Sequence, residues 1–209
     1  MKHKFFFSIL VLLIFLSCIN NKKKDALDLN NLGLLDKFDP TSSIIFFTKA
    51  IELNPEFEQA YNNRGFKKEI LNDYVGALFD YNKAIELDSN YHTAIHNRGV
   101  LYFNCKKYDL ALLDYNKAIK IDSTLDFYYF DRGVLFFYIK NYYKAISDLN
   151  KTITLNPKYS DAYYYKANSY LELKNNNEYL YNLVKAKDMG CQLAKNQYDT
   201  LIYYSNELR

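Results

Sequence analysis

An arginine-glycine dipeptide recurs along this chain at a fixed interval of 34 residues. Its three copies are Arg64-Gly65, Arg98-Gly99 and Arg132-Gly133. A period of roughly 20–50 residues is typical of proteins built from stacked, self-similar units, because one such unit cannot bury a core by itself. The period therefore predicts a modular array with an extended binding surface. It does not indicate what is bound.

Further residue types recur with the same interval. The rows are Ala77, Ala111 and Ala145; Tyr74, Tyr108 and Tyr142; Asp80, Asp114 and Asp148; and Asn82, Asn116 and Asn150. Within 58–72 and 76–87, apolar and small residues fall near helical spacing. The whole chain has only six glycines and three prolines, as expected for a nearly all-helical protein. These patterns predict pairs of helices joined by turns at 72–73 and 106–107.

The positions of small and aromatic residues resemble the tetratricopeptide repeat, a helix-turn-helix unit of 34 residues. The matching residues are Tyr61, Gly65, Ala77, Tyr81 and Ala84 in 58–91; Ile95, Gly99, Ala111, Tyr115 and Ala118 in 92–125; Tyr129, Gly133, Ala145 and Leu149 in 126–159; and Tyr163, Ala167, Leu183 and Ala186 in 160–193. Tyr179 stands where the family has alanine, and a degenerate first copy occupies about 24–57. The resemblance implies an all-α, right-handed α-solenoid of about five repeats over 25–191. An amphipathic segment, 192–209, is expected to cap the last repeat.

The periodic arginines fall on the first helix of each repeat and the periodic aspartates on the second. We interpret each Arg–Asp set as an ion pair that ties the two helices of a repeat together. In the fourth copy both members change together, to Lys166 and Asn182. The alternative hypothesis is that the arginines line up in a groove and grip an acidic ligand. Their offset from the groove positions argues against it.

The N-terminal segment has the pattern of a secretory signal. Lys2 and Lys4 precede an almost continuously apolar run, 5–16, which is too short to span a bilayer comfortably. The run leads to Ser17-Cys18, which resembles the lipobox of bacterial lipoproteins. The resemblance implies that residues 1–17 are removed and that Cys18 is acylated. The alternative is an ordinary signal peptide or an uncleaved anchor in which Cys18 has no role.

The polar and basic segment that follows, 18–24 with its lipidated cysteine, is expected to tether the array to a membrane. Residue 19 is isoleucine rather than an acid. By the usual sorting rule of enterobacterial lipoproteins, this would favour the outer membrane. The expected location is the bacterial cell envelope, lipid-anchored and facing the periplasm.

Composition and spacing exclude several classes of function. Without residues 1–17 the chain has 25 basic and 24 acidic residues, so it lacks the concentrated basic charge of a nucleic-acid-binding protein. Cys105 and Cys191 lie more than two repeats apart and are expected to stay unpaired. His92 and His96 share one side of a helix, but no third metal ligand accompanies them. We expect no metal, no cofactor and no enzymatic activity, because no catalytic motif occurs either.

In the tetratricopeptide family the first helix of each repeat lines a concave groove. The resemblance places ten residues on this face: Asn62, Phe66, His96, Val100, Phe103, Phe127, Phe130, Phe137, Tyr164 and Asn168. Such an aromatic stripe suits an extended peptide or a helix with apolar anchors. The alternative is that these rings pack between repeats and are hidden. The lysines with which some family members grip a C-terminal carboxylate are missing, because His96 and Phe130 occupy the matching positions.

These observations together predict a membrane-anchored scaffold or adaptor that binds a protein or peptide partner in the groove. The alternative is a structural component that self-associates within an envelope complex and holds no ligand in the groove. A homo-oligomer would be expected only in the second case.

Overall fold

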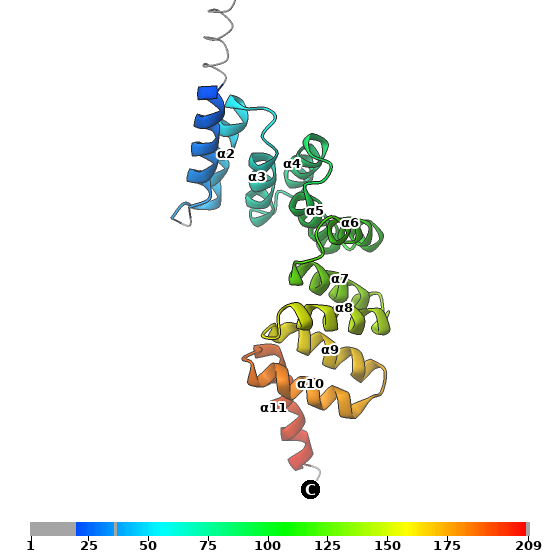
Figure 1. Ribbon diagram of the computed structural model, residues 1–209. Coiled ribbons are helices and arrows are strands. Elements are labelled where there is room, and N and C mark those ends of the chain that lie inside the picture. The colour runs from blue at the N-terminus through cyan, green and yellow to red at the C-terminus, as the bar shows by residue number, and fades with distance from the viewer. Residues whose placement is uncertain (1–19, 36, 208–209) are drawn as a thin grey trace, which may run out of the picture. The chain divides into compact units, whose positions relative to one another are not determined.

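The computed structural model describes residues 20–35 and 37–207, and every regular element in this part of the chain is an α-helix (Figure 1). Residues 20–33 are helical. They are followed by α2 (Pro40–Leu53), α3 (Glu58–Ile70), α4 (Tyr74–Leu87), α5 (His92–Asn104), α6 (Tyr108–Ile121), α7 (Asp126–Tyr138), α8 (Tyr142–Leu155), α9 (Ser160–Glu172), α10 (Asn176–Asp188) and α11 (Gln192–Glu207). Within repeats, α3 packs on α4, α7 on α8 and α9 on α10. The prediction of an all-α array of helix-turn-helix repeats is confirmed.

The described helices form two compact units, one ending at Leu101 and one beginning at Tyr102, so the boundary falls within α5. The first unit has a core rich in alanine: Ala26, Ala50, Ile51, Ala60, Tyr61, Ala84 and Ala94. Tyr81 is fully buried beside Ala77 and Leu101. A Cβ atom on Gly65 would lie 3.0 Å from Cε1 of Tyr81 and 3.2 Å from the carbonyl oxygen of Ala77. Glycine at this position therefore allows the close approach of α3 and α4.

The second unit follows the same plan. A Cβ atom on Gly133 would lie 3.1 Å from Cγ of Leu149, which is fully buried on α8. The last repeat and α11 share a core: Tyr163, Ala167, Tyr179, Leu183, Ala186, Cys191 and Ala194. Tyr179 is buried where the family has alanine. The fourth repeat therefore packs around an aromatic ring at a position where a methyl group is usual.

The turns within repeats share one backbone conformation. Asn72, Lys106, Lys140 and Lys174 have φ angles of 63°, 58°, 61° and 59°. A residue in this left-handed region ends a helix and turns the next N–H back toward its last carbonyl groups, and Asp73 N donates to Lys68 O at 2.9 Å. Asp73 then caps α4 by accepting from Gly76 N, and Asn141 caps α8 by accepting from Lys144 N. The turns predicted at 72–73 and 106–107 are confirmed.

Two terminal segments differ from the prediction, and the predicted signal peptide and Cys18 lie outside the described residues. Residues 20–24, assigned to the tether, are helical and exposed, since a lysine-rich run without glycine or proline favours a helix. In α11, Ala194 is buried, but Leu193 and Leu201 are 53% and 39% exposed. Only the first half of α11 covers the last repeat. Gly190, between α10 and α11, has a φ of 89°, a left-handed conformation in which glycine commonly ends a helix.

Candidate functional site

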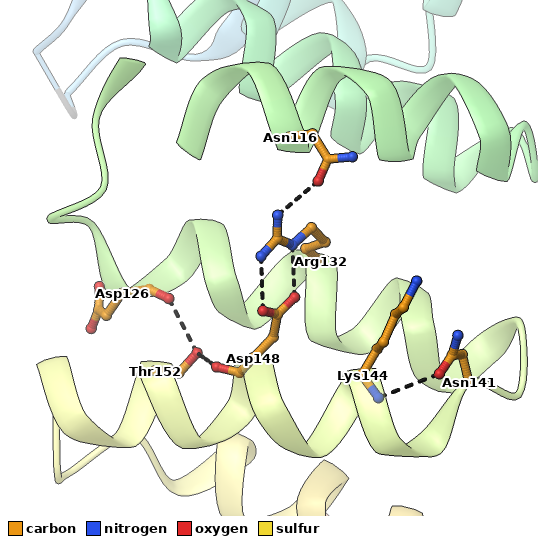
Figure 2. Close-up of polar contacts among 7 residues, drawn as sticks. All are labelled: Asn116, Asp126, Arg132, Asn141, Lys144, Asp148 and Thr152. Atoms are coloured by element: carbon orange, nitrogen blue, oxygen red, sulfur yellow. Dashed lines mark hydrogen bonds and ion pairs between the residues drawn. The ribbon is translucent and has the colours of Figure 1, made fainter. Parts of the chain in front are cut away.

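Arg132 links three helices of the second unit (Figure 2). Its Nε donates to Oδ2 of Asp148 at 2.7 Å, and its Nη2 donates to Oδ1 at 2.8 Å. The remaining Nη1 donates to Oδ1 of Asn116 at 2.7 Å, on the second helix of the preceding repeat. A two-pronged bond between guanidinium and carboxylate fixes the geometry of both side chains. Arg132 therefore fastens the helices of its own repeat and also joins that repeat to its neighbour.

The first unit contains the same arrangement. Arg64 donates to both carboxylate oxygens of Asp80, at 2.9 and 2.7 Å, and reaches Thr48 Oγ1 at 3.2 Å. Lys68 Nζ adds a second ion pair to Asp80 at 2.8 Å. Arg98 donates to Asn82 at 2.7 Å. The structural interpretation is confirmed for the arginines at 64 and 132, whose charges are used within the repeats.

The fourth repeat lacks this ion pair. Asn182 is fully buried, and its Nδ2 donates to the main-chain oxygen of Glu178 at 2.7 Å. Its Oδ1 has no hydrogen-bond partner. Burial lowers the pKa of Lys166, and the nearby Glu178 opposes that effect. Lys166 and Asn182 stand where the other repeats have arginine and aspartate. Their presence therefore removes the ion pair and leaves the last repeat with a weaker polar connection.

Two polar residues predicted to face the groove are buried in the first unit. Asn62 and His96 are 4% and 5% exposed. Asn62 Oδ1 accepts from Asn97 Nδ2 at 2.9 Å, and Asn63 Nδ2 donates to Asn30 Oδ1 at 3.0 Å. The expectation that Asn62 and His96 offer open polar groups is wrong, because both side chains are buried and the Asn62 amide is paired with Asn97 of α5. Asn63 and Asn97 lie one 34-residue period apart. The period could therefore have identified them as equivalent positions in neighbouring repeats.

The other predicted groove residues vary in exposure. Phe66 and Phe127 are 48% and 37% exposed. Val100, Phe103, Phe130, Phe137, Tyr164 and Asn168 are half-buried. Asn168 Oδ1 accepts from Gln197 Nε2 of α11 at 3.0 Å. Its side chain is therefore held by the C-terminal helix, which sequence reasoning did not foresee.

The aromatic residues of the second unit form a connected group. Ring centroids of Phe130 and Tyr159 lie 4.7 Å apart, and those of Phe137 and Tyr165 lie 5.7 Å apart. We define the aromatic cluster as the rings joined by such contacts: Phe103, Tyr108, Phe130, Phe137, Tyr138, Tyr142, Tyr159, Tyr164 and Tyr165. Tyr138 is 51% exposed. The rings thus pack on one another, as the alternative proposed, yet stay partly open to solvent.

Sequence reasoning missed five members of the aromatic cluster. These are Tyr108, Tyr138, Tyr142, Tyr159 and Tyr165. Tyr108 and Tyr142 had a signal, because they belong to a periodic row at the start of second helices. Tyr138 and Tyr159 lie at the end of a helix or just before one, outside the groove spacing. No helical periodicity predicts contacts of residues in such positions.

Three tyrosines of the aromatic cluster, Tyr142, Tyr159 and Tyr165, have raised pKa values, which favours their neutral form. Burial, together with the nearby Tyr138, Tyr164 and Asp161, raises the pKa of Tyr165 to about 12. Burial also raises the pKa of Tyr159, with additional effects of Asp131, Asp126 and Asp161. A neutral phenol both donates and accepts a hydrogen bond. These hydroxyl groups can therefore donate to a carbonyl oxygen or accept from an N–H group of a bound segment.

Three further features of the described residues bear on function. Among residues 20–35 and 37–207, no three histidine, cysteine, aspartate or glutamate side chains gather closely enough to hold a metal ion. No helix in the same part of the chain combines the length and the apolar character needed to cross a bilayer. Cys105 is exposed and Cys191 is buried, and both are free, as expected from their spacing.

Comparisons with known proteins agree with this architecture. Residues 93–125 match the family model described as tetratricopeptide repeat. A structure titled "Crystal structure of YrrB: a TPR protein with an unusual peptide-binding site" is 22% identical, with 88% of this chain and 97% of that chain covered and a TM-score of 0.68. PilF of Pseudomonas aeruginosa is 18% identical, with 90% and 92% covered and a TM-score of 0.75. MamA of Desulfovibrio magneticus RS-1 is 16% identical, with 79% and 94% covered and a TM-score of 0.71. No curated protein matches the sequence.

Proposed function

Because this chain is a tetratricopeptide repeat protein, we propose that it is a non-catalytic scaffold that binds a segment of another protein on its aromatic cluster. The observation that carries the proposal is the aromatic cluster itself. Phe130 and Phe137 lie seven residues apart on α7 and so share a face of that helix. Their rings contact Tyr165 of α9, and both rings remain only half-buried.

Rigid aromatic side chains suit such a role. They offer a large contact area and lose little conformational entropy when a partner binds. Here each ring is already held by its neighbours, with centroid separations of 4.7–5.9 Å. An extended segment with apolar anchors could pack its anchors onto the exposed sides of rings such as Phe103 and Tyr138 while the neutral hydroxyl groups bond its main chain. The similar YrrB structure is described as having a peptide-binding site, which supports this use of the fold.

A co-purification experiment tests the binding surface. Phe130→Gln/Phe137→Gln keeps helix-forming side chains but removes two rings, so we expect captured partners to fall at least about tenfold. Phe79→Gln is the matched control, because Phe79 is 64% exposed on α4 and belongs to the other unit. Circular dichroism establishes that each variant folds, and Phe130→Leu/Phe137→Leu replaces the glutamine variant should that one unfold. Equal capture by the double variant and the wild type would refute the aromatic cluster as the binding surface.

The alternative, self-association, is favoured by one observation. Leu193 and Leu201 of α11 are 53% and 39% exposed, whereas terminal elements of repeat arrays usually present a polar outer face. The same experiment separates the two functions when it includes a second, differently tagged copy of the chain. Recovery of that copy as the main partner, in equal amounts from the wild type and the Phe130→Gln/Phe137→Gln variant, would indicate self-association.

We further propose that the scaffold is held at a bacterial envelope membrane by lipid on Cys18, on the outer membrane and facing the periplasm. The apolar run 5–16 followed by Ser17-Cys18 supports this proposal. Two attached acyl chains give stable anchoring, whereas one gives only marginal binding. We expect mass spectrometry of the mature protein to detect a diacylglyceryl group on an N-terminal Cys18. The Cys18→Ser variant should lose it and leave the membrane fraction. An intact segment 1–17 in the wild type would contradict the anchor.

A further inference from the structure

Carboxylate groups border the aromatic cluster at more than one point. Glu172 accepts a hydrogen bond from the hydroxyl of Tyr142, with 3.1 Å between Oε2 and the phenol oxygen. Around Tyr159, Asp126, Asp131 and Asp161 are close enough to act on its phenol. Glu172 and Asp161 are exposed. Two exposed carboxylates, those of Asp161 and Glu172, therefore lie beside the aromatic cluster, where a partner can reach them.

Six cationic side chains of this unit lie against rings outside the aromatic cluster. Their cation–π contacts are Arg132 with Tyr129 and Phe136, Lys144 with Phe136, Lys151 with Tyr129, Lys166 with Tyr170, Lys185 with Tyr163 and Lys187 with Tyr198. In the described part of the second unit, none of these contacts uses a ring of the aromatic cluster. The ion pairs Arg132–Asp148 and Lys187–Asp188 likewise leave out Asp161 and Glu172.

We propose that the aromatic cluster selects a cationic partner segment, an extended peptide in which lysine or arginine accompanies apolar anchors. The face of an aromatic ring attracts a cation, and a carboxylate beside the ring adds to the attraction. The same arrangement repels an acidic segment, which gives discrimination as well as affinity. This inference rests on the proposed function, because it names the chemistry of the partner for the same surface.

Three labelled synthetic peptides test the charge preference with the full-length protein in detergent. They share one leucine-containing frame and carry lysine, glutamine or glutamate at the same remaining positions. Fluorescence anisotropy at low salt is expected to give a dissociation constant for the lysine peptide at least about tenfold below that of the glutamate peptide, with the glutamine peptide between them. Added salt should narrow the difference, because exposed charges are screened.

Two double variants, each of which removes two carboxylates, test whether the preference for the lysine peptide arises beside the aromatic cluster. Asp161→Asn/Glu172→Gln removes two carboxylates beside the aromatic cluster and should reduce the preference for lysine over glutamate severalfold. Asp188→Asn/Asp199→Asn removes the same charge from exposed positions on α10 and α11 and should leave the preference unchanged. Circular dichroism checks the fold of both.

The outcomes separate this inference from the proposed function. One outcome is that the wild type binds all three peptides with equal affinity while the Phe130→Gln/Phe137→Gln variant binds none. That result would overturn the charge preference and leave the aromatic cluster as the binding surface. Equal loss of preference in both charge variants would show that net charge, and not the aromatic cluster, is responsible. Binding of none of the three peptides would also overturn the inference, while the co-purification experiment would still decide the proposed function.

Discussion

Replacing Arg132 by methionine is expected to lower the free energy of unfolding by about 3 kcal/mol. The side chain of Asp148 is only 10% exposed, and both its oxygens accept from this one guanidinium. Methionine restores apolar volume but leaves the carboxylate without its cation, and an unpaired buried charge costs more than the pair contributes. The hydrogen bond to Asn116 is lost as well, which loosens the connection to the preceding repeat.

The same change at Arg64 provides the comparison. Lys68 Nζ lies 2.8 Å from Oδ2 of Asp80, so Asp80 keeps a cation in the Arg64→Met variant. We expect that variant to lose only about 1 kcal/mol. In Arg132→Met/Asp148→Leu the orphaned charge is gone, and most of the lost stability should return. Urea unfolding followed by circular dichroism measures all three. Losses of equal size at the two arginines would show that the second cation does not support Asp80.

The second large effect concerns Tyr81, whose replacement by alanine is expected to cost about 4 kcal/mol. Tyr81 is fully buried beside Ala77 and Leu101, and its ring occupies the space left by Gly65. Alanine would leave a cavity in a region where the backbones of α3 and α4 already approach closely and cannot collapse further.

One further variant separates the contribution of the Tyr81 ring to stability from that of its hydroxyl group, and another serves as a surface control. Tyr81→Phe keeps the ring and loses only the hydrogen bond to Glu69 Oε2, at 2.9 Å, so it should cost about 1 kcal/mol. Tyr143→Ala serves as the control, because Tyr143 is 77% exposed and its loss should change stability by less than about 0.5 kcal/mol. Urea midpoints compare the three. A loss in Tyr81→Phe as large as in Tyr81→Ala would assign the stability to the hydroxyl group instead of the packing.

The sequence by itself determined the local architecture and part of the site. The 34-residue period and the helical spacing within it predicted the helix pairs and the turns between them. The interval of 16 residues between arginine and aspartate was enough to predict the ion pairs at 64 and 132, since one turn brings both positions together. These features depend on contacts inside a repeat, where helical geometry fixes which residues share a face.

Only the tertiary structure decided which residues on the groove-facing side of the first helices are exposed. It buried Asn62 and His96, which the family resemblance had placed in an open groove. It also joined Tyr159 and Tyr165 to Phe130 in the aromatic cluster and left Leu201 of α11 exposed. The physical reason is that exposure depends on the size and rotamer of side chains one repeat away. A sequence period assigns a residue to a face, but packing across repeats determines whether that face is open, covered or shared.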